Sequence, residues 1–419
     1  MQTNSDLALL YKEEVDFKHT DRVSVVVVTF NKYSYVRDLI LSFDKLNYNK
    51  DLLDIIIVDN ASNDGTEEKL KEEFADQITL IQTGANLGGS GGFNTGMKYA
   101  IENFDNDYVW LVDNDVVVQC DSLNYLLDTL KQNPQAACVG SLIMQLDQPQ
   151  IVSEMGSFMD WSAAKVDMQE TNHNYNELQS RDERQVDYCA AASLLKTRKS
   201  IEDIGYWEEF FIHFDDVDWC LRAKENNYQV FCNPKSIVFH ESMEHKQPTW
   251  IKYYNIRNLL YLYAEHKPAL LPKIFLKFSF GALYYFFHGY LKNSAMVFKA
   301  VMDFVFGKKK KQEFEHEHYK SLNSLGVEKL DNAIFVFKSQ ENLDSFCEKF
   351  GFDISRAAEV LVYPEKKGIF SLLGFALKQY AKTLFSSKTV ILDGAFESSF
   401  MFPLFRSKIV VYPRYMTFV

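Results

Sequence analysis

The sequence predicts an α/β fold with a mostly parallel β-sheet. Residues 23–30 and 55–58 are nearly continuous β-branched runs, as expected of strands buried on both faces of such a sheet. Helical patterns separate these runs, and strands that alternate with helices are typical of parallel βαβ arrays. Both observations therefore indicate the same fold class.

The composition limits the functions that this chain of 419 residues can have. Its net charge of -12 and pI near 5.3 argue against a general nucleic-acid binder, which would carry a basic face. Its six cysteines are scattered without a CxxC pair, so neither a zinc knuckle nor a redox motif is supported. The polar, acidic residues 1–21 lack the apolar run of a signal peptide. We therefore expect no nucleic-acid partner and a reducing, cytoplasmic environment.

The first part of the chain places polar residues at the ends of predicted strands. Strands are expected at 23–30, 55–58 and 78–81, with helices at 36–43 and 66–74 between them. In parallel α/β sheets, ligands bind at the carboxyl ends of the strands. The polar residues at these ends are Thr29, Asn31, Asp59 and Asn60. They are either turn residues or, because two strand ends converge on one edge, parts of a binding site.

A glycine-rich segment, residues 86–96, is predicted to be a turn that leads into a helix. Backbone N–H groups in such a turn suit an anionic phosphate. The two common nucleotide motifs fail, because Met97 occupies the P-loop lysine position and Asn94 replaces the last glycine of GxGxxG. This segment alone is therefore a weak sign of a phosphate site.

The apolar strand predicted at 108–112 ends in Asp113, Asn114 and Asp115. Two carboxylates at one strand end are suited to Mg²⁺ or Mn²⁺ shared with a diphosphate. A calcium loop is not supported, because residues 116–118 lack the later oxygen ligands and the glycine of such loops. A plain turn is the other alternative. The apolar, central character of the strand favours the metal.

A second block of elements follows this strand. Helices are expected at 121–131 and 250–264, and strands at 136–144, 186–195, 230–232 and 237–239. The polar residues 151–187 are expected to form an irregular substrate loop or lid. His240 ends the last of these strands. A lone strand-end histidine is usually structural, and this one becomes a third metal ligand only if the fold brings it to the two aspartates.

Residues 210–219 place three carboxylates among aromatic side chains. Charges in such surroundings are costly to bury unless they are paired, so at least one carboxylate is expected to face a polar cleft. Apolar walls there would raise its pKa towards that of a useful general base. The alternative is that Asp215 or Asp216 simply caps the helix that follows.

Together these residues resemble the inverting family 2 glycosyltransferases of the GT-A nucleotide-sugar fold, from about residue 23 to residue 264. The resemblance rests on residues 28–31, 59–60, 86–92, 113–115, 211–219 and 240. The pattern at 210–218 is similar to the polymerising galactofuranosyltransferases in particular. Asn114 departs from that group, which tends to carry a third acid there, and rhamnosyltransferases of the family share most of the set.

The resemblance implies a role for each matching residue. Asp216, beside Asp215, would deprotonate the acceptor hydroxyl, and Mn²⁺ or Mg²⁺ would be held by Asp113, Asp115 and His240. Asp59 would bind uracil. The residues expected to bind the nucleotide sugar are Thr29, Phe30, Asn31, Asp59, Asn60, Asn86, Gly88, Gly89, Ser90, Asn94, Asp113, Asn114 and Trp207.

The expected reaction is transfer of galactofuranose from UDP-galactofuranose to a growing, lipid-linked cell-surface polysaccharide. A rhamnosyltransferase that uses dTDP-rhamnose is the alternative within the family. A nucleotidyltransferase and a non-catalytic nucleotide-sugar-binding scaffold are alternatives of other classes. The first would also use an Asp-x-Asp and a metal, but the basic triphosphate-gripping loop that it usually carries is not found here.

Four regions are predicted along the chain: an N-terminal segment (1–21), a GT-A domain (22–265), an amphipathic helical region (266–312) and a small α/β unit (313–419). The third region is rich in aromatic residues and closes on four lysines, 308–311. Lysines interrupt it too often for a transmembrane span. It is either a helical hairpin packed on the catalytic domain or a peripheral contact with the inner face of the cytoplasmic membrane, which a lipid-linked acceptor favours. An oligomer is possible.

Overall fold

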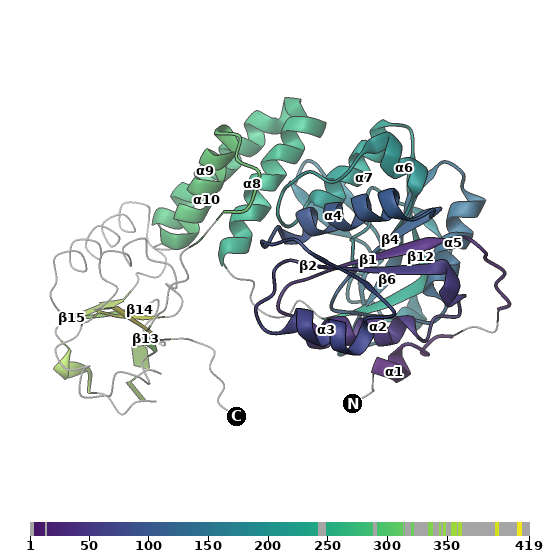
Figure 1. Cartoon of the computed structure of the whole chain (residues 1–419). Coiled ribbons are helices and arrows are strands. Elements are labelled where there is room, and N and C mark those ends of the chain that lie inside the picture. Colours follow the sequence, from purple (N-terminus) through teal and green to yellow (C-terminus); the bar gives the residue numbers. More distant parts are fainter. Residues whose placement is uncertain are drawn as a thin grey trace. The chain divides into compact units, whose positions relative to one another are not determined.

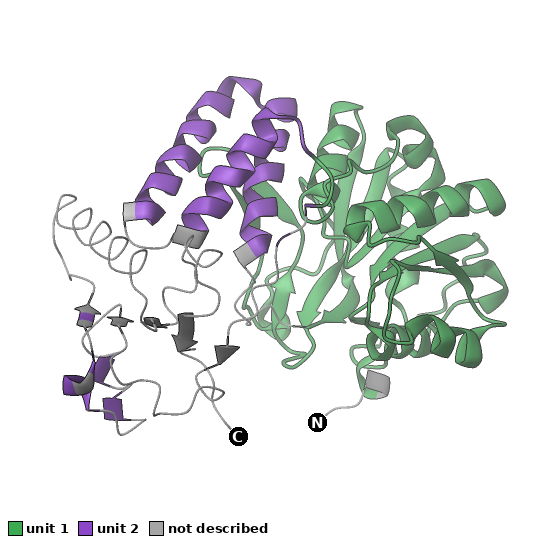
Figure 2. Cartoon of the chain, turned by 60° about the vertical axis from the view of Figure 1, so that its left-hand side comes forward, with its two compact units in different colours: residues 1–247, 309–311 green, residues 248–308, 312–419 purple. Residues whose placement is uncertain are grey.

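The structure is a computed structural model of the whole chain. It describes residues 4–12, 15–241, 249–287, 291–312, 314, 320–321, 334–337, 343–344, 347–348, 353–357, 359–362, 390–393 and 409–412. The chain divides into two compact units (Figures 1 and 2). The first comprises Met1–Gln247 and Lys309–Lys311, and the second comprises Pro248–Lys308 and Gln312–Val419.

The first unit is built on a ten-stranded sheet of order β10-β12-β6-β11-β4-β1-β2-β3, with β5 paired to β12 and β7 paired to β6. The strands are β1 (Val23–Thr29), β2 (Leu53–Asp59), β3 (Thr79–Gln82), β4 (Tyr108–Asp113), β5 (Val116–Val118), β6 (Ala136–Gln145), β7 (Val152–Glu154), β10 (Arg184–Gln185), β11 (Ser193–Thr197) and β12 (Gln229–His240). β3, β2, β1 and β4 are parallel neighbours, and β6 is parallel to β12. β11 runs antiparallel between β4 and β6. The predicted α/β class with a mostly parallel sheet is confirmed.

Helices cover both faces of this sheet (Figure 1). The helices of the first unit are α1 (Asn4–Leu7), α2 (Tyr33–Phe43), α3 (Thr66–Phe74), α4 (Gly88–Asn103), α5 (Ser122–Gln132), α6 (Arg198–Ile204) and α7 (Asp215–Glu225), with the 3-10 turn η1 (Lys50–Leu52) before β2. Val25 and Val27 of β1 join a buried cluster with Leu39 of α2 and Leu123 of α5. Because side chains alternate along a strand, Val26 and Val28 face the opposite side, where α4 packs.

The glycine-rich segment is a helix, which corrects the predicted turn. α4 begins at Gly88, so the glycines lie inside it. Packing explains them: a Cβ at Gly92 would lie 2.4 Å from Cγ1 of Val28, and a Cβ at Gly96 would lie 2.2 Å from Cγ1 of Val26. Glycine lowers helix propensity but allows this close approach of α4 to β1.

The polar segment 151–187 is more regular than predicted. It contains β7, the antiparallel hairpin of β8 (Ser157–Asp160) and β9 (Lys165–Met168), the 3-10 turn η2 (Tyr175–Glu177), and β10. Three of the four residues of β9 are exposed. An exposed strand lacks the alternation of apolar and polar residues by which a strand is recognised in a sequence. The strand predicted at 186–195 is shorter and shifted to β11, and the two short strands after it are one strand, β12, with a register shift between Asn233 and Ile237.

The second unit contains a helical group and a separate sheet. The helices are α8 (Thr249–His266), η3 (Pro268–Leu270), α9 (Leu271–Phe287) and α10 (Leu291–Val305), and α8, α9 and α10 contact one another. The sheet is parallel, of order β13-β17-β16-β14-β15, with β13 (Lys320–Ser321), β14 (Ile334–Phe337), β15 (Glu359–Val362), β16 (Val390–Asp393) and β17 (Ile409–Tyr412); η6 (Ile354–Arg356) precedes β15. Among the described helices, none has the length and apolar character needed to cross a bilayer.

Candidate active site

Three parallel strands bring polar residues to one edge of the first unit's sheet. The register pairs Thr29 at the end of β1 with Asp59 at the end of β2, and Val28 with Asp113 at the end of β4. Asn114 follows Asp113 and donates a hydrogen bond from Nδ2 to Oγ1 of Thr29 (3.2 Å). The strand-end residues singled out in the sequence therefore share one edge, where ligands of such sheets bind.

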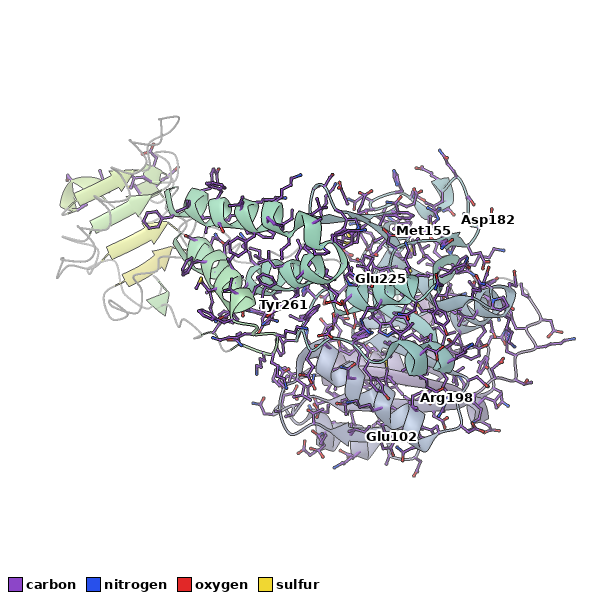
Figure 3. All side chains as sticks on the ribbon, turned by 90° about the horizontal axis from the view of Figure 1, so that it is seen from above. Glu102, Met155, Asp182, Arg198, Glu225 and Tyr261 are labelled. Atoms are coloured by element: carbon purple, nitrogen blue, oxygen red, sulfur yellow. The ribbon has the colours of Figure 1, made fainter. Side chains whose placement is uncertain are left out.

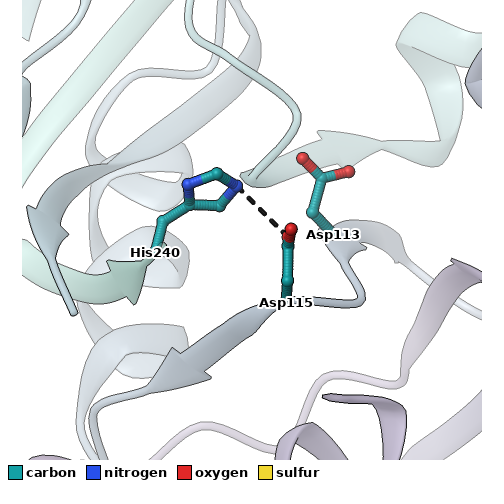
Figure 4. Close-up of side chains that lie close together, drawn as sticks. All are labelled: Asp113, Asp115 and His240. Carbon is teal, nitrogen blue, oxygen red and sulfur yellow. Dashed lines mark ion pairs between the residues drawn. The ribbon is translucent and has the colours of Figure 1, made fainter. Parts of the chain in front are cut away.

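Asp113, Asp115 and His240 form a compact cluster at this edge (Figure 4). One ligand atom from each of the three lies within 4.8 Å of the others. β12 pairs with β5 so that His240 is opposite Val116, the residue after Asp115. His240 Nε2 lies 3.2 Å from Oδ1 of Asp115, and its Nδ1 lies 2.9 Å from the carbonyl oxygen of Glu241. The fold thus brings the strand-end histidine to the two aspartates.

The electrostatics of the cluster favour a cation. Burial and the neighbouring Asp115 raise the pKa of Asp113 to about 7. Burial alone would lower the pKa of His240, but its hydrogen bond and ion pair with Asp115 raise it to about 9. Two carboxylates and an imidazole are a donor set that fits a divalent ion such as Mn²⁺, whose charge would relieve the repulsion between the aspartates.

The predicted uracil ligand, Asp59, organises the loop after β2. It is fully buried, and its Oδ1 accepts hydrogen bonds from the N–H (3.0 Å) and the hydroxyl (2.5 Å) of Ser62. Its Oδ2 accepts a hydrogen bond from Nε2 of Gln82 (2.8 Å). Asn31, with φ of 55°, donates its N–H to Oγ of Ser62 (2.8 Å), and the Phe30 side chain beside it is exposed.

The N-terminal part of α4 lies beside the segment that precedes α7. Asn60 Nδ2 donates to the carbonyl of Gly88 (2.9 Å), and Asn86 accepts the N–H of the same glycine (2.9 Å). A Cβ at Gly89 would lie 4.0 Å from Oδ2 of Asp215. The predicted sugar-nucleotide residues of α4 and the predicted catalytic aspartates are thus neighbours.

The acidic pair is located in the first turn of α7. The helix begins at Asp215, and the residue at its N-cap position, Phe214, makes no side-chain capping hydrogen bond. Asp216 accepts hydrogen bonds from the N–H of Val217 at Oδ1 (2.7 Å) and of Ala191 at Oδ2 (3.3 Å). Burial raises the pKa of Asp216, and the negative charge of Asp216 in turn raises the pKa of Asp113. The predicted base and the metal cluster therefore share one electrostatic environment.

Two charged residues near the site escape a motif-based search. Glu154, at the end of β7, is buried, accepts a hydrogen bond from the Ser157 hydroxyl (2.6 Å), and has its pKa raised to about 7 by burial, with the charge of Asp216 adding to the effect. Lys196, on β11, is completely buried. Each is a single residue in a strand, so neither spacing nor composition marks it in the sequence.

Comparisons with known proteins agree on the family. Residues 24–199 match the sequence profile described as "Glycosyl transferase family 2". Galactofuranosyltransferase GlfT2 of Mycobacterium tuberculosis is 28% identical over 198 residues, covering 43% of this chain and 31% of that protein. The N-acetylglucosaminyl-diphospho-decaprenol L-rhamnosyltransferase of the same species is 25% identical over 246 residues, covering 53% of this chain and 76% of that protein. GlfT2 of Mycolicibacterium smegmatis is 26% identical over 270 residues, so the chain spans 31% and 41% of the two GlfT2 proteins.

Solved structures with similar folds have lower sequence identity to this chain than these relatives do. GalNAc-T7, crystallised with UDP, GalNAc and Mn²⁺, has a TM-score of 0.48 and 16% identity, over 59% of this chain and 48% of that one. The mannosyltransferase PcManGT of Pyrobaculum calidifontis, in complex with GDP-Man and Mn²⁺, has a TM-score of 0.45 and 15% identity, over 73% and 96%. The segment matched by the family profile lies wholly within the first unit and includes β1 to β4, Asp113 and Asp115. Residues 24–199 of this chain are therefore similar to the glycosyltransferases of family 2.

Proposed function

We propose that the chain is a metal-dependent inverting glycosyltransferase that moves galactofuranose from UDP-galactofuranose to a growing, lipid-linked glycan. The observation that carries the proposal is the cluster of Asp113, Asp115 and His240, whose electrostatic environment includes the half-buried carboxylate of Asp216. A metal site beside a base is what transfer from a sugar diphosphate to a hydroxyl requires.

The residues divide the chemistry between the two sides of the sugar. Asp113, Asp115 and His240 would hold Mn²⁺ or Mg²⁺, which when bound neutralises the charge of the diphosphate leaving group. Asp216 accepts the proton of the acceptor hydroxyl while that oxygen bonds to the anomeric carbon and the bond to the diphosphate breaks. Attack from the side opposite the leaving group inverts the anomeric carbon. Burial raises the pKa of Asp216 and so strengthens it as a base.

The donor is proposed from the relatives. The galactofuranosyltransferase resemblance centres on residues 210–218, whereas the rhamnosyltransferase relative is covered over 76% of its length and supports dTDP-rhamnose as the second candidate. A nucleotidyltransferase and a nucleotide-sugar-binding scaffold differ from both in the products they would give.

A panel of donors distinguishes these functions. The protein is incubated with UDP-galactofuranose, UDP-galactopyranose and dTDP-rhamnose, each with Mn²⁺ or with EDTA, and products are followed by mass spectrometry. We expect transfer or slow donor hydrolysis only in the reaction that contains both UDP-galactofuranose and Mn²⁺. Turnover with dTDP-rhamnose only would assign the rhamnosyl alternative. Formation of a nucleoside triphosphate and a sugar 1-phosphate when pyrophosphate is added would assign a nucleotidyltransferase. Binding without turnover of any donor would assign a scaffold.

We also propose that α9 contacts the anionic inner face of the cytoplasmic membrane, where a lipid-linked acceptor would lie. Ile274 and Ala282 are buried, whereas Leu276, Phe280, Leu283 and Tyr284 are exposed and repeat at helical spacing. Lys273 and Lys277 are exposed at the same spacing, and α9 contains no acidic residue. Apolar and basic side chains on one helix face suit an anionic lipid surface.

The four lysines at 308–311 are a poorer candidate for this contact than the sequence alone suggests. Lys308 pairs with Asp303 of α10 (3.2 Å). Lys309 and Lys310, which belong to the first unit, pair with Glu208 (2.7 Å) and Glu209 (2.9 Å). Because acidic side chains of this chain already neutralise three of these lysines, we assign the lipid contact to α9.

A further inference from the structure

We propose that Asn94 and Ser90, on the glycine-rich helix α4, are positioning residues that hold the loop carrying the catalytic base. This loop, residues 207–214, is the last part of the connection from α6 to α7 and ends immediately before Asp215; we call it the base loop. The inference rests on the proposed function, in which Asp216 is the base.

The backbone of the base loop is strained. Phe211, His213 and Phe214 have φ of 73°, 64° and 68°, in the left-handed region that side chains other than glycine disfavour. Each such residue costs about 1 to 2 kcal/mol. Three of them within four positions mean that local preferences oppose this conformation, so contacts from outside the loop must maintain it.

Asn94 and Ser90 supply those contacts. Asn94 Oδ1 accepts the N–H of Trp207 (2.9 Å), and its Nδ2 donates to the carbonyl oxygen of the same residue (2.8 Å). Ser90 Oγ accepts the N–H of Phe211 (2.8 Å). Asn94 is 9% exposed and Ser90 is fully buried, so water cannot readily replace either partner. The two side chains are four residues apart on α4 and clamp both ends of a five-residue stretch.

Further contacts make α4 a firm support. A Cβ at Gly88 would lie 2.0 Å from the carbonyl oxygen of Phe211, so only glycine allows the loop to approach this closely. The rings of Phe93 and Trp207 meet edge-on at 5.0 Å. At the other end of α4, Arg198 of α6 donates to the carbonyls of Ile101 (2.9 Å) and Phe104 (3.0 Å), and Figure 3 labels it near Glu102 of α4. The helix is therefore tied at both ends to the segment that leads to the base.

This arrangement assigns the two side chains a role different from donor binding. Their hydrogen-bonding atoms are directed at the backbone of the base loop, and Asp216 follows that loop by two residues. Loss of either clamp should misplace the carboxylate of Asp216, and small displacements of a catalytic group have large effects on rate. The turnover number should therefore fall while affinity for the donor nucleotide is maintained.

The test compares Asn94→Ala and Ser90→Ala with the parent in the full-length protein. UDP affinity in the presence of Mn²⁺ is measured by calorimetry, and kcat for transfer is measured with the donor found active in the panel. We expect kcat to fall by roughly 10-fold with UDP affinity changed less than twofold. Ser90→Thr retains the hydroxyl and should recover most of the lost activity. A weakened UDP affinity with unchanged kcat would overturn the inference, because the side chains would then serve the nucleotide.

A double-mutant cycle with Asp216→Asn separates the inference from the proposed function. If Asp216→Asn alone leaves transfer intact, the proposed base is wrong. If it lowers transfer and Asn94→Ala lowers it again by the same factor as in the parent, Asn94 does not act through Asp216, and the inference fails. We expect instead that the double variant is about as active as Asp216→Asn alone. If Asn94→Ala does not fold, the cycle is run with Ser90→Ala, which removes a single hydrogen bond.

Discussion

The ammonium nitrogen of Lys196 lies 3.4 Å from the ring centre of Trp219 and 4.8 Å from that of Trp207. It is fully buried, and none of the residues that the structure describes accepts a hydrogen bond from it. Attraction to two aromatic rings offsets only part of the cost of removing an ammonium group from water. Burial accordingly lowers the pKa of Lys196 to about 7.

Replacement of this lysine by an apolar side chain of similar length should stabilise the protein. We expect Lys196→Met to raise the free energy of unfolding by about 1 to 3 kcal/mol at pH 6 to 7. Above pH 7 the unfolded chain, with a lysine pKa of about 10.4, holds a proton that the folded protein has lost. The penalty in the parent therefore decreases as pH rises from 7 towards 10, and the gain of the variant should narrow.

Urea unfolding of both proteins at several pH values measures this gain. Lys199→Met is the control. Lys199 is the exposed second residue of α6, and its replacement should give no comparable gain in the free energy of unfolding. A gain that is equal at pH 7 and pH 9.5 would contradict the pKa assigned to Lys196.

Asp216→Asn should abolish most transfer without unfolding the protein. Asparagine keeps the shape, and its one amide oxygen can still accept the N–H of Val217, but the longer hydrogen bond from Ala191 is lost and the side chain cannot take a proton. Donor binding should persist while kcat falls by roughly 100-fold. Asp215→Asn is the matched control in the same turn. A larger loss at Asp215 than at Asp216 would move the base by one position.

Asp113→Asn or Asp115→Asn should weaken Mn²⁺-dependent binding of UDP by roughly 10-fold or more, because each removes one of three converging donors. The melting temperature without metal should not fall for Asp113→Asn, because this change removes carboxylate repulsion. Asp115→Asn also removes the ion pair with His240, so a lower melting temperature is expected for that variant. Calorimetry with UDP and Mn²⁺ measures the affinity, and Asp105→Asn, at an exposed position, is the control. A variant that binds UDP and Mn²⁺ as the parent does would show that the metal is held elsewhere.

Two double variants of α9 test the proposed lipid contact. Lys273→Gln with Lys277→Gln should lower binding to phosphatidylserine vesicles by roughly 30-fold at low salt, since each lysine near an anionic surface contributes about 1 kcal/mol. Phe280→Ser with Leu283→Ser should lower binding to the same vesicles at both low and high salt. Co-sedimentation is the measurement, with Lys69→Gln of α3 as control. Binding that neither double variant changes would rule out α9 as the docking face.

The parts of the fold that the sequence predicts well are those with a strong local cause. β1, β2 and β4 contain consecutive apolar residues, and consecutive apolar residues predict a strand that is buried on both faces, as these strands are. α3 has the predicted bounds because charged residues surround a buried pair, Leu70 and Phe74. Asp113 and Asp115 could be singled out because they lie at the carboxyl end of a central strand, and ligands of parallel α/β sheets bind at these ends.

The remainder depends on contacts between distant residues. α4 is helical in spite of its glycines because they allow close packing on β1, which no local propensity expresses. The approach of His240 to Asp115 depends on the pairing of β12 with β5. Glu154 and Lys196 derive their properties from burial, and burial of one charged residue within a strand leaves no periodic signal.

The pairing of Lys309 with Glu208 means that the first unit is not one uninterrupted stretch of chain. The polypeptide leaves it after Gln247 and returns for three residues at Lys309–Lys311. A fragment truncated near residue 265 would lack these lysines, so Glu208 and Glu209, which belong to the strained base loop, would lose the ion pairs with Lys309 and Lys310. A fragment meant to keep these ion pairs therefore has to extend beyond residue 311.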